Sequence, residues 1–434
     1  MRSLFIIFSF FSLSVAAGAG DQKPVESLPA LIESALRNNP ELKSSQARWK
    51  MYLGKAQQAG NLDDPMFMFK LQNVVARQPL TFGGADPQTA KVVSISQLLP
   101  FWGKRALKED VAHYEAESYR WSLEERKIEL RRMVTEVWYQ LYSIDRALTV
   151  VDRNIRILSD FAAIAETRYA VGQGAQQDIF KAGLEKSKML DMQISLRQQR
   201  TSLEANLNYL LFRSPGSTVG EIGEFELPRL ALSPETLKET AFERRPQLKS
   251  LFMLASKGLA GHRLARAESY PDFNLTFEYM FREAAMGDPG YNMYSLGVTF
   301  NLPFLQKEKR HAMQAEASSE TDMAMEELNA AKNAIAYAIA DNLARLERRK
   351  KLVELYSTGI IPQAEQSLES ALIGYRVGKV DFLTLLDGRV SLFNYERELY
   401  DSKAEFMMAL ARLEATVGAE LVPAEAAASE SHPH

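Results

Sequence analysis

The sequence predicts a mostly α-helical fold with a small β part, built from one structural unit that occurs twice. Two very long segments, 103–169 and 307–375, contain one proline between them, Pro362, so each is expected to be helical along its length. Two pairs of short runs alternate apolar with polar side chains, as the strands of β-hairpins do. The chain also matches itself at an offset of about 206 residues, which indicates an internal duplication.

The duplication is carried by residues that keep the same order in both halves. The matching pairs are 40–44 with 246–250, 99–101 with 302–304, 104–105 with 309–310, and 169–172 with 375–378. The offset changes by only a few residues, and the changes fall in the expected hairpin loops, where insertions are tolerated. We therefore expect two structural repeats at 20–212 and 234–418, joined by a segment at 213–233 and followed by a C-terminal tail at 419–434.

The first 19 residues have the pattern of an export signal. Arg2 precedes an apolar run over 4–15, and the small residues at 17–19 fit a cleavage site. Residues 1–19 are therefore predicted to be a signal peptide. The apolar run is shorter than the ~20 residues that a membrane-spanning helix needs, and no other stretch approaches that length.

Each repeat is predicted to contain the same elements in the same order: a helix, a hairpin, a very long helix, a glycine-containing turn and a further helix. In the first repeat the ranges are 28–60, 65–98, 103–169 and 176–212, and in the second they are 234–269, 272–302, 307–375 and 381–417. At about 1.5 Å per residue, each long helix measures ~100 Å. The two shorter helices of a repeat are therefore expected to stack end to end and pack antiparallel along the long one.

The hairpin strands have one apolar, aromatic face and one mostly polar face. Apolar residues alternate with polar ones from Phe273 to Phe281, and again from Tyr294 to Phe300. This pattern is typical of transmembrane β-strands, although the strands of a soluble amphipathic sheet alternate in the same way. Four strands cannot close a barrel, which needs about eight, so the membrane interpretation requires several copies of the chain. A trimer with twelve strands is the simplest solution.

Composition excludes several classes of function. The chain has no Cys, which rules out thiolate metal sites, disulfides and cysteine nucleophiles. Its 52 Lys and Arg are balanced by 55 Asp and Glu, so nothing indicates a basic surface for nucleic acid. Because no HExxH, GxSxG or GxxxxGK motif is present, the sequence predicts no enzyme, and we expect neither a cofactor nor a bound metal.

These features together resemble the outer-membrane efflux protein family typified by TolC. The resemblance rests on the export signal, the duplicated order of elements, the run SerGlnLeuLeuProPheTrpGlyLysArg at 96–105, and two TyrxxGly turns. It covers about residues 28–418. The family implies a trimer in which four strands per protomer build a shared twelve-stranded β-barrel in the outer membrane. A long α-helical coiled-coil tunnel continues the barrel across the periplasm, with 213–232 and the segment from 419 onward as a belt around its middle.

The resemblance also implies a role and partners. A family member is the passive exit duct of a tripartite efflux system and works with a periplasmic adaptor and an inner-membrane pump. The runs AspProMetPheMet at 64–68 and GlnLeuLeuProPheTrpGlyLys at 97–104 are most similar to the branch paired with heavy-metal exporters, so heavy-metal cations are a predicted cargo. Drugs or secreted proteins are alternative cargoes. A periplasmic coiled-coil scaffold or adaptor is the alternative function, which leaves the aromatic strands unexplained.

The two turns between long and short helices are the predicted tip of the tunnel. Tyr169 and Gly172 belong to the first turn, and Tyr375 and Gly378 belong to the second. The glycines would supply the positive φ angle that a tight turn after a helix needs. Because the turns lie far from the strands along the chain, they are expected at the periplasmic end of the duct, where it narrows.

Three acids near these turns are candidates for the constriction. Family members carry acids six residues after the first-turn glycine, and six and nine residues after the second-turn glycine. Asp178 and Asp387 match two of these positions, Thr384 replaces the third acid, and Asp381 is close enough to substitute for it. In a trimer such acids would form negative rings that favour cations. Capping of the following helix is the alternative role of Asp178 and Asp381.

Two basic residues of the second turn are also candidates for the gate. Arg376 and Lys379 are predicted to hold the tip closed by pairing with a neighbouring acid such as Asp178. Exposed charge pairs contribute only about 0–1 kcal/mol each, so several would have to act together.

Three aromatic residues adjoin the ends of the predicted strands. Phe101, Trp102 and Tyr270 are therefore expected to form part of an aromatic girdle at the membrane interface, where such rings lie at the depth of the lipid headgroups.

Overall fold

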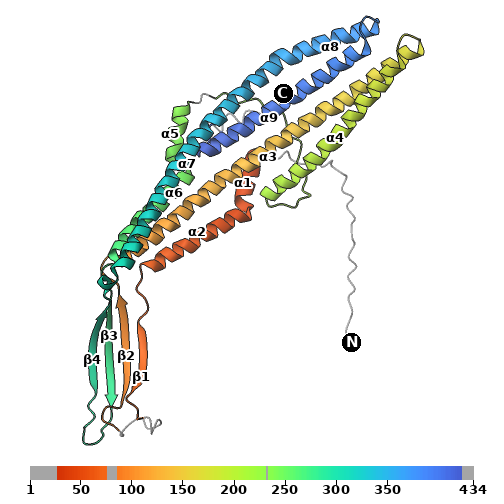
Figure 1. Cartoon of the computed structure of the whole chain (residues 1–434). Coiled ribbons are helices and arrows are strands. Elements are labelled where there is room, and N and C mark those ends of the chain that lie inside the picture. The colour runs from red at the N-terminus through yellow and green to blue at the C-terminus, as the bar shows by residue number, and fades with distance from the viewer. Residues whose placement is uncertain (1–26, 76–85, 231–232, 423–434) are drawn as a thin grey trace, which may run out of the picture.

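The structure is a computed structural model, and it describes residues 27–75, 86–230 and 233–422. The predicted signal peptide at 1–19 and most of the predicted tail lie outside these residues. The molecule is elongated, with the strands at one end and two helix–turn–helix tips at the other (Figure 1). The chain is mostly helical with a small antiparallel sheet, as the sequence predicts.

The helices of the first repeat are α1 (Leu28–Asn38), α2 (Pro40–Ala59), α3 (Lys104–Ala170) and α4 (Gln176–Leu210). With 67 residues, α3 runs unbroken from the strands to the tip, in agreement with the predicted long helix. Both α2 and α4 pack along α3, the first toward the strands and the second toward the tip (Figure 1). The two shorter helices are therefore arranged along the long one as expected.

The prediction of one helix over 28–60 is wrong, because the chain bends at Asn39. A residue before proline is disfavoured in the α conformation, and Asn39 is extended, with a ψ angle of 123°. The Asn39 side chain then caps α2 by accepting hydrogen bonds from the amides of Glu41 and Leu42. The bend sets α1 apart from the line of α2 (Figure 1).

The second repeat bends in the same way. Helix α5 (Pro234–Arg244) ends at Arg245, whose ψ angle of 121° is also extended, and α6 (Pro246–Ala267) begins at the next residue. The prediction of one helix over 234–269 is therefore wrong for the same reason. The bend is a property of the duplicated unit.

The second long helical path contains a local irregularity. After a short 3₁₀ turn η1 (Pro303–Gln306), it consists of α7 (Lys307–Leu355), a π-helical turn η2 (Tyr356–Ile360) and α8 (Ile361–Arg376). Pro362 explains the π turn, because proline lacks an N–H and its ring crowds the carbonyl of the preceding turn. The path continues to the tip, so the predicted long helix is present with one wider turn. Helix α9 (Phe382–Val417) returns from the tip.

The described strands form one antiparallel sheet in the order β1-β2-β3-β4. Their bounds are β1 Met66–Gln72, β2 Ala90–Leu99, β3 Phe273–Arg282 and β4 Met293–Phe300. The two hairpins join between β2 and β3, where Leu99 lies opposite Phe273. In the single protomer β1 and β4 are edge strands, and every residue of β4 is exposed.

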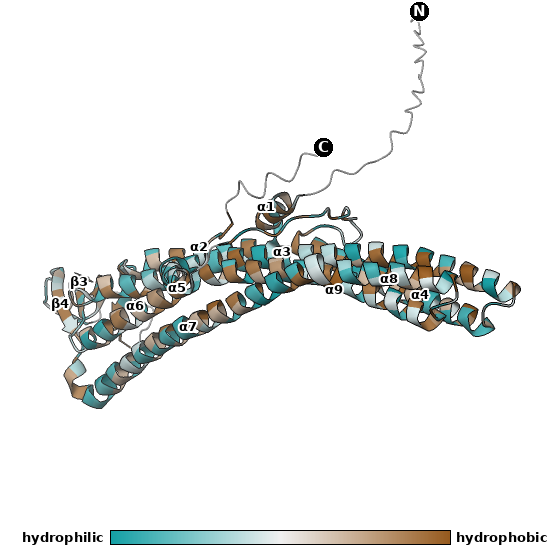
Figure 2. Ribbon diagram, turned by 90° about the horizontal axis from the view of Figure 1, so that it is seen from above, coloured by the Kyte–Doolittle hydropathy of each residue, from teal (hydrophilic) through white to brown (hydrophobic). Residues whose placement is uncertain are grey.

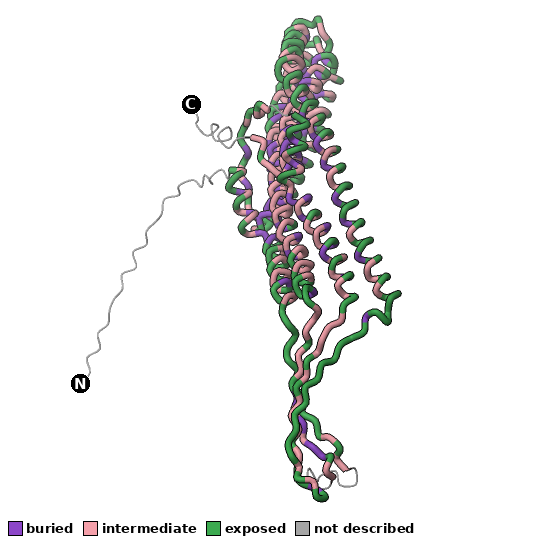
Figure 3. Tube along the Cα trace, turned by 90° about the vertical axis from the view of Figure 1, so that its left-hand side faces the viewer, coloured by how far each residue is buried: buried purple, intermediate pink, exposed green. Residues whose placement is uncertain are grey.

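The buried residues lie mainly in the helical body and few lie in the sheet (Figure 3). One apolar cluster joins α1, α3 and the end of α4, a second joins the four helices nearest the tip, and a third joins α5, α7 and α9. Polar and apolar residues alternate around the helices (Figure 2). Among the described helices, none combines the length and the apolar character that a membrane span requires.

The segment between the repeats packs against the middle of α3. Val219 and Ile222 are buried there, and the Phe225 ring lies 4.6 Å from the Tyr142 ring, centre to centre. The buried Asp145 carboxylate of α3 accepts hydrogen bonds from the Ile222 amide and the Arg200 guanidinium. These contacts hold the segment across the helices at about half their length.

Candidate functional site at the end of the helices

The two tip turns have the same backbone geometry. Gly172 and Gly378 adopt positive φ angles of 74° and 75°. After each glycine, the chain closes a Schellman-type cap: Gln173 donates to the Arg168 carbonyl at 2.9 Å, and Lys379 donates to the Gly374 carbonyl at 2.8 Å. The predicted role of the two glycines as turn residues agrees with this geometry.

Arg168, in the last turn of α3, connects the two tips. Its guanidinium donates to the carbonyl of Tyr375 in the second tip and to the carbonyl of Gln173 in the first, the latter at 3.0 Å. It also lies 4.6 Å from the centre of the Tyr375 ring, within the range of a cation–π contact. A single side chain thus links α3, the first turn and the end of α8.

Sequence reasoning did not select Arg168, although the duplication contains one signal. The residue at the matching position of the second repeat is Gly374, so the arginine is present in one repeat only. Arg168 thus contacts the second repeat from a position at which the second repeat itself has no side chain.

The two tip tyrosines have different surroundings. Tyr375 is 3% exposed and packs in the cluster nearest the tip, whereas Tyr169 is 48% exposed. Burial and the nearby Asp178 carboxylate raise the pKa of the Tyr375 hydroxyl. Of the predicted tip residues, Tyr375 and Asp178 are therefore brought together, and Tyr169 remains at the surface.

The acids near the turns also differ from one another. Asp381 is the N-cap of α9, and its carboxylate accepts a hydrogen bond from the Thr384 amide at 3.1 Å. Hydrogen bonds from the Thr384 side chain and amide lower the pKa of Asp381. Capping is wrong as an explanation of Asp178, because Ala175 is the N-cap of α4. Asp387 is exposed on α9.

The basic residues of the second tip face solvent. Arg376 and Lys379 are both exposed, and within the residues that the structure describes neither forms an ion pair in the single protomer. The predicted pairing with Asp178 is thus not formed inside one protomer.

The junction between strands and helices contains the three predicted girdle residues. The Phe101 and Tyr270 rings stack with centres 4.6 Å apart, and Trp102 meets Phe101 edge-on at 5.4 Å. Trp102 is 81% exposed and Tyr270 is 53% exposed. An exposed, clustered group of rings at the end of a sheet suits a membrane interface.

Beside these rings, a buried lysine holds the two repeats together. Lys104, the first residue of α3, is 1% exposed. Its ammonium donates to the Asp272 carboxylate at 2.8 Å, the Tyr270 carbonyl at 2.9 Å and the Glu268 carboxylate at 3.3 Å. Burial alone would raise the pKa of Asp272, but hydrogen bonds from Lys104 and the Phe101 amide outweigh it and lower that pKa. We call this contact the Lys104 clamp.

With this geometry established, comparison with known proteins identifies the family. The sequence profile of the outer membrane efflux protein family matches residues 31–211 and 237–419, which correspond to the two repeats. The chain belongs to the outer membrane efflux protein family.

Relatives and solved structures agree with this membership. The cobalt-zinc-cadmium resistance protein CzcC of Cupriavidus metallidurans is 22% identical over 296 residues, which cover 67% of this chain and 68% of CzcC. The outer membrane protein VceC of Vibrio cholerae superposes with a TM-score of 0.78 at 18% identity and covers 91% of this chain and 97% of VceC. The channel protein CusC superposes with a TM-score of 0.75 at 15% identity, covering 94% and 96%. The fold is therefore that of the TolC-like channels.

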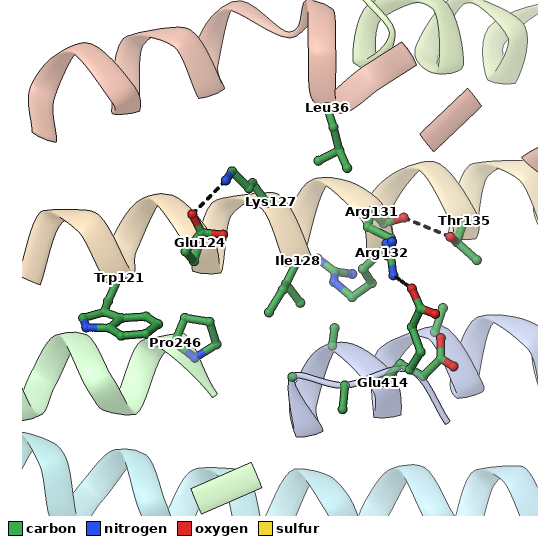
Figure 4. A pocket seen from close by; sticks show the side chains of 15 residues that line it. Leu36, Trp121, Glu124, Lys127, Ile128, Arg131, Arg132, Thr135, Pro246 and Glu414 are labelled. Atoms are coloured by element: carbon green, nitrogen blue, oxygen red, sulfur yellow. Dashed lines mark hydrogen bonds and ion pairs between the residues drawn. The ribbon is translucent and has the colours of Figure 1, made fainter. Parts of the chain in front are cut away.

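This outer membrane efflux protein also has a cavity of about 480 Å³ at half its length, between α1, α3, α6 and the end of α9 (Figure 4). Two ion pairs lie within its lining, Lys127 with Glu124 and Arg131 with Glu420, and Arg132 pairs with Glu136 outside it. Burial raises the pKa of Glu414, which accepts a hydrogen bond from the Leu421 amide. Because three acidic and three basic side chains line the cavity, it has no excess of one charge that would select an ion.

The described residues also bear on metal binding. No group of three or more His, Asp or Glu side chains is arranged to hold a metal ion within 27–75, 86–230 and 233–422.

Proposed function

We propose that this protein is the outer-membrane exit duct of a tripartite efflux system and that it works as a homotrimer. Three copies of the sheet would close a twelve-stranded barrel, and the helices would extend it through the periplasm to an adaptor and an inner-membrane pump. One observation carries the proposal: an amphipathic sheet stands at one end of a 67-residue helix, and two tight turns stand at the other. This is the shape of one third of a duct wall.

The surface of the sheet supports the membrane part of the proposal. Phe273 lies opposite Phe300, and Leu275 lies opposite Val298, so the four side chains share one face. Leu275, Val298 and Phe300 are 44–59% exposed in the protomer. A face of exposed aliphatic and aromatic side chains is stable against lipid and unstable against water.

The tip supports the proposal of a constriction that favours cations. Asp387 is exposed near the start of α9, and Asp178 lies beside Tyr375 on the opposite helix pair. Three copies of each acid around an axis would stabilise a passing cation. CzcC is named for cobalt-zinc-cadmium resistance, which supports heavy-metal cations as cargo. Another relative at 22% identity is named toxin and drug export protein A, which supports the alternative cargoes.

The first test is the assembly and location of the mature protein. Envelope membranes would be stripped with urea or carbonate, the protein extracted in detergent, and its mass measured by native mass spectrometry. We expect a trimer that resists stripping. A monomer that washes off the membrane would overturn the proposal and favour the periplasmic scaffold.

A second test addresses the constriction. In planar bilayers, the Asp387→Asn variant is expected to lower the ratio of cation to anion permeability, because a ring of three negative charges is removed. Asp322→Asn is the matched control, since Asp322 is an exposed acid of α7 that lies far from the tip. Equal permeability ratios in the two variants would exclude Asp387 from the constriction.

A further inference from the structure

The junction between strand and long helix occurs twice in the protomer. Lys104 begins α3 three residues after Phe101, and Lys307 begins α7 three residues after Phe304. Both phenylalanines end a LeuProPhe run. The structural counterpart of Lys104 is therefore Lys307, rather than Lys309 as the sequence match suggests.

The two junctions differ in what surrounds them. Lys104 is buried and has three acceptors, whereas Lys307 is exposed and, in the described part of the chain, forms no ion pair. Phe101 stacks on Tyr270, whereas Phe304 is 61% exposed. The second junction therefore has the same residues as the first without their contacts.

Strand order explains where the missing contacts would come from. The helix after β2 is clamped by the loop before β3, the strand that pairs with β2, and this loop carries Glu268 and Asp272. The helix after β4 starts with Lys307, but β4 has a free edge. The other free edge is β1, and the loop before β1 carries two acids, Asp63 and Asp64.

These two acids are available for a contact. Asp63 and Asp64 are both exposed, and neither forms an ion pair among residues 27–75, 86–230 and 233–422. Pro65 follows them as Pro271 follows Tyr270, so the two loops match at the proline. The loop before β1 is one residue longer, and its acids stand at different positions from Glu268 and Asp272. What the loops share is two carboxylates next to a strand edge.

Apolar residues beside the acids also make a contact in the first junction that is absent from the second, in the part of the chain that the structure describes. In the first junction, Trp102 lies 6.1 Å from Phe273, ring centre to ring centre. The matching residues of the second junction are Leu305 and Phe67, which are 71% and 73% exposed and stand on opposite edges of the protomer. Both halves of an apolar contact are thus present, one at each edge.

We propose that Lys307 of one protomer is clamped by Asp63 and Asp64 of a second copy of this chain, next to a Leu305–Phe67 contact, so that the Lys104 clamp is repeated across each protomer boundary. The inference rests on the proposed assembly, because it needs β4 of one copy beside β1 of the next. Beyond that assembly, the proposal names the residues that would connect the strands to the helices at each protomer boundary. Within each protomer one clamp is internal, and the other is completed by the neighbour.

Crosslinking tests the contact directly, because the chain has no Cys. The double variant Lys307→Cys with Asp64→Cys, treated with a short bis-maleimide in intact membranes, is expected to yield covalent dimers and trimers on denaturing gels. The double variant Lys309→Cys with Asp64→Cys is the matched control, because residues two apart on a helix point in different directions. It should yield much less crosslinked protein, as should each single-cysteine variant.

Native mass spectrometry of the same preparations separates the two possible failures. A trimer that crosslinks through Lys309→Cys as well as through Lys307→Cys, or through neither, would overturn the clamp and leave the proposed duct intact. A monomer would overturn the proposed assembly itself.

A charge exchange tests whether the contact is an ion pair. Lys307→Glu is expected to lower the temperature at which the trimer dissociates in detergent, and Lys309→Glu, which changes the charge equally, should leave it unchanged. Adding Asp63→Lys and Asp64→Lys to Lys307→Glu should restore the dissociation temperature. A triple variant no more stable than Lys307→Glu alone would show that the three residues do not pair.

Discussion

The two strand–helix junctions have similar sequences and opposite surroundings. Lys104 is buried among acceptors from the second repeat, and its counterpart Lys307 is exposed at the edge of the protomer. The long helices differ in the same sense: α3 packs against α1, α2, α4, α6 and α9, whereas α7 packs against α5, α6 and α9. In the proposed trimer, the first repeat of each protomer is covered by its own second repeat, and the second repeat would be covered by the next protomer. We therefore expect matched residues that differ in burial to mark the interface between protomers.

The largest loss of stability is expected at Lys104, because this lysine and its counterpart Lys307 differ most in burial. Lys104→Ala would leave the Asp272 and Glu268 carboxylates without their buried partner, which we expect to cost about 3 kcal/mol of unfolding free energy. We take the lower end of the usual range because these side chains are still 24% and 23% exposed. Urea unfolding of the detergent-solubilised protein would measure the loss.

The control for Lys104→Ala is Lys309→Ala, which removes an exposed lysine near the start of the other long helix. Its cost should stay within about 0.5 kcal/mol. Similar losses in the two variants would mean that burial of Lys104 does not stabilise the junction.

Acid should weaken the Lys104 clamp. The pKa of Asp272 is lowered in the folded protein, so the stability it contributes is present above its usual pKa and is lost as the pH falls through the lower folded value. Below about pH 4, the difference in unfolding free energy between the parent protein and Lys104→Ala should shrink. A difference that stays constant down to about pH 2 would contradict the pairing of Asp272 with Lys104.

A smaller effect is expected at the tip, where Arg168 connects two turns and Arg376 faces solvent. Arg168→Ala would remove the guanidinium donor from the carbonyls of Tyr375 and Gln173, and the Tyr375 carbonyl would keep its hydrogen bond from the Gly378 amide. The expected cost is about 1.5–3 kcal/mol, because hydrogen bonds from charged donors are the stronger ones. Amide hydrogen exchange in both tip turns should become about tenfold faster or more. Arg168→Lys should fall between, because lysine keeps the charge without the forked donors.

Arg376→Ala is the matched control for the tip. It removes the same side chain from an exposed position close to the second turn, so exchange in the first turn should not change. Faster exchange in both turns of Arg376→Ala would show that loss of any positive charge near the tips loosens them. The hydrogen bonds of Arg168 would then not be the cause.

Much of this structure follows from local patterns, and the remainder depends on contacts between distant parts. The absence of proline predicts the unbroken α3, and the two-residue alternation predicts β3 and β4. The bend at Asn39 also has a local signal, an asparagine before a proline. The prediction of one helix over 28–60 did not use this signal. The roles of Arg168 and Lys104 depend on how one repeat lies on the other, which no local pattern records. The same holds for Asp178, whose neighbour Tyr375 lies on the other helix pair.

The smallest effect on stability is expected at Gly374, a glycine that allows close packing at the second tip. A Cβ atom on Gly374 would lie 2.6 Å from Cγ2 of Val380, so Gly374→Ala must displace that side chain, at a cost of about 1 kcal/mol. Gly183 also lies within a helix, but a Cβ atom there would meet nothing within 4 Å. Gly183→Ala should therefore stabilise the protein by about 0.5–1 kcal/mol, through higher helix propensity alone.

The double variant Gly374→Ala with Val380→Ala isolates the cause of the loss at the second tip. Removing both γ carbons of Val380 leaves room for the new Cβ atom, so the double variant should lose less stability than the sum of its two single variants. Thermal unfolding of the four proteins gives this coupling energy. The first turn shows the reverse arrangement, since its bulky residue is Arg168 and its small one is Gly174. A coupling energy of zero would mean that the two turns tolerate either arrangement, and that packing does not determine which residue is small.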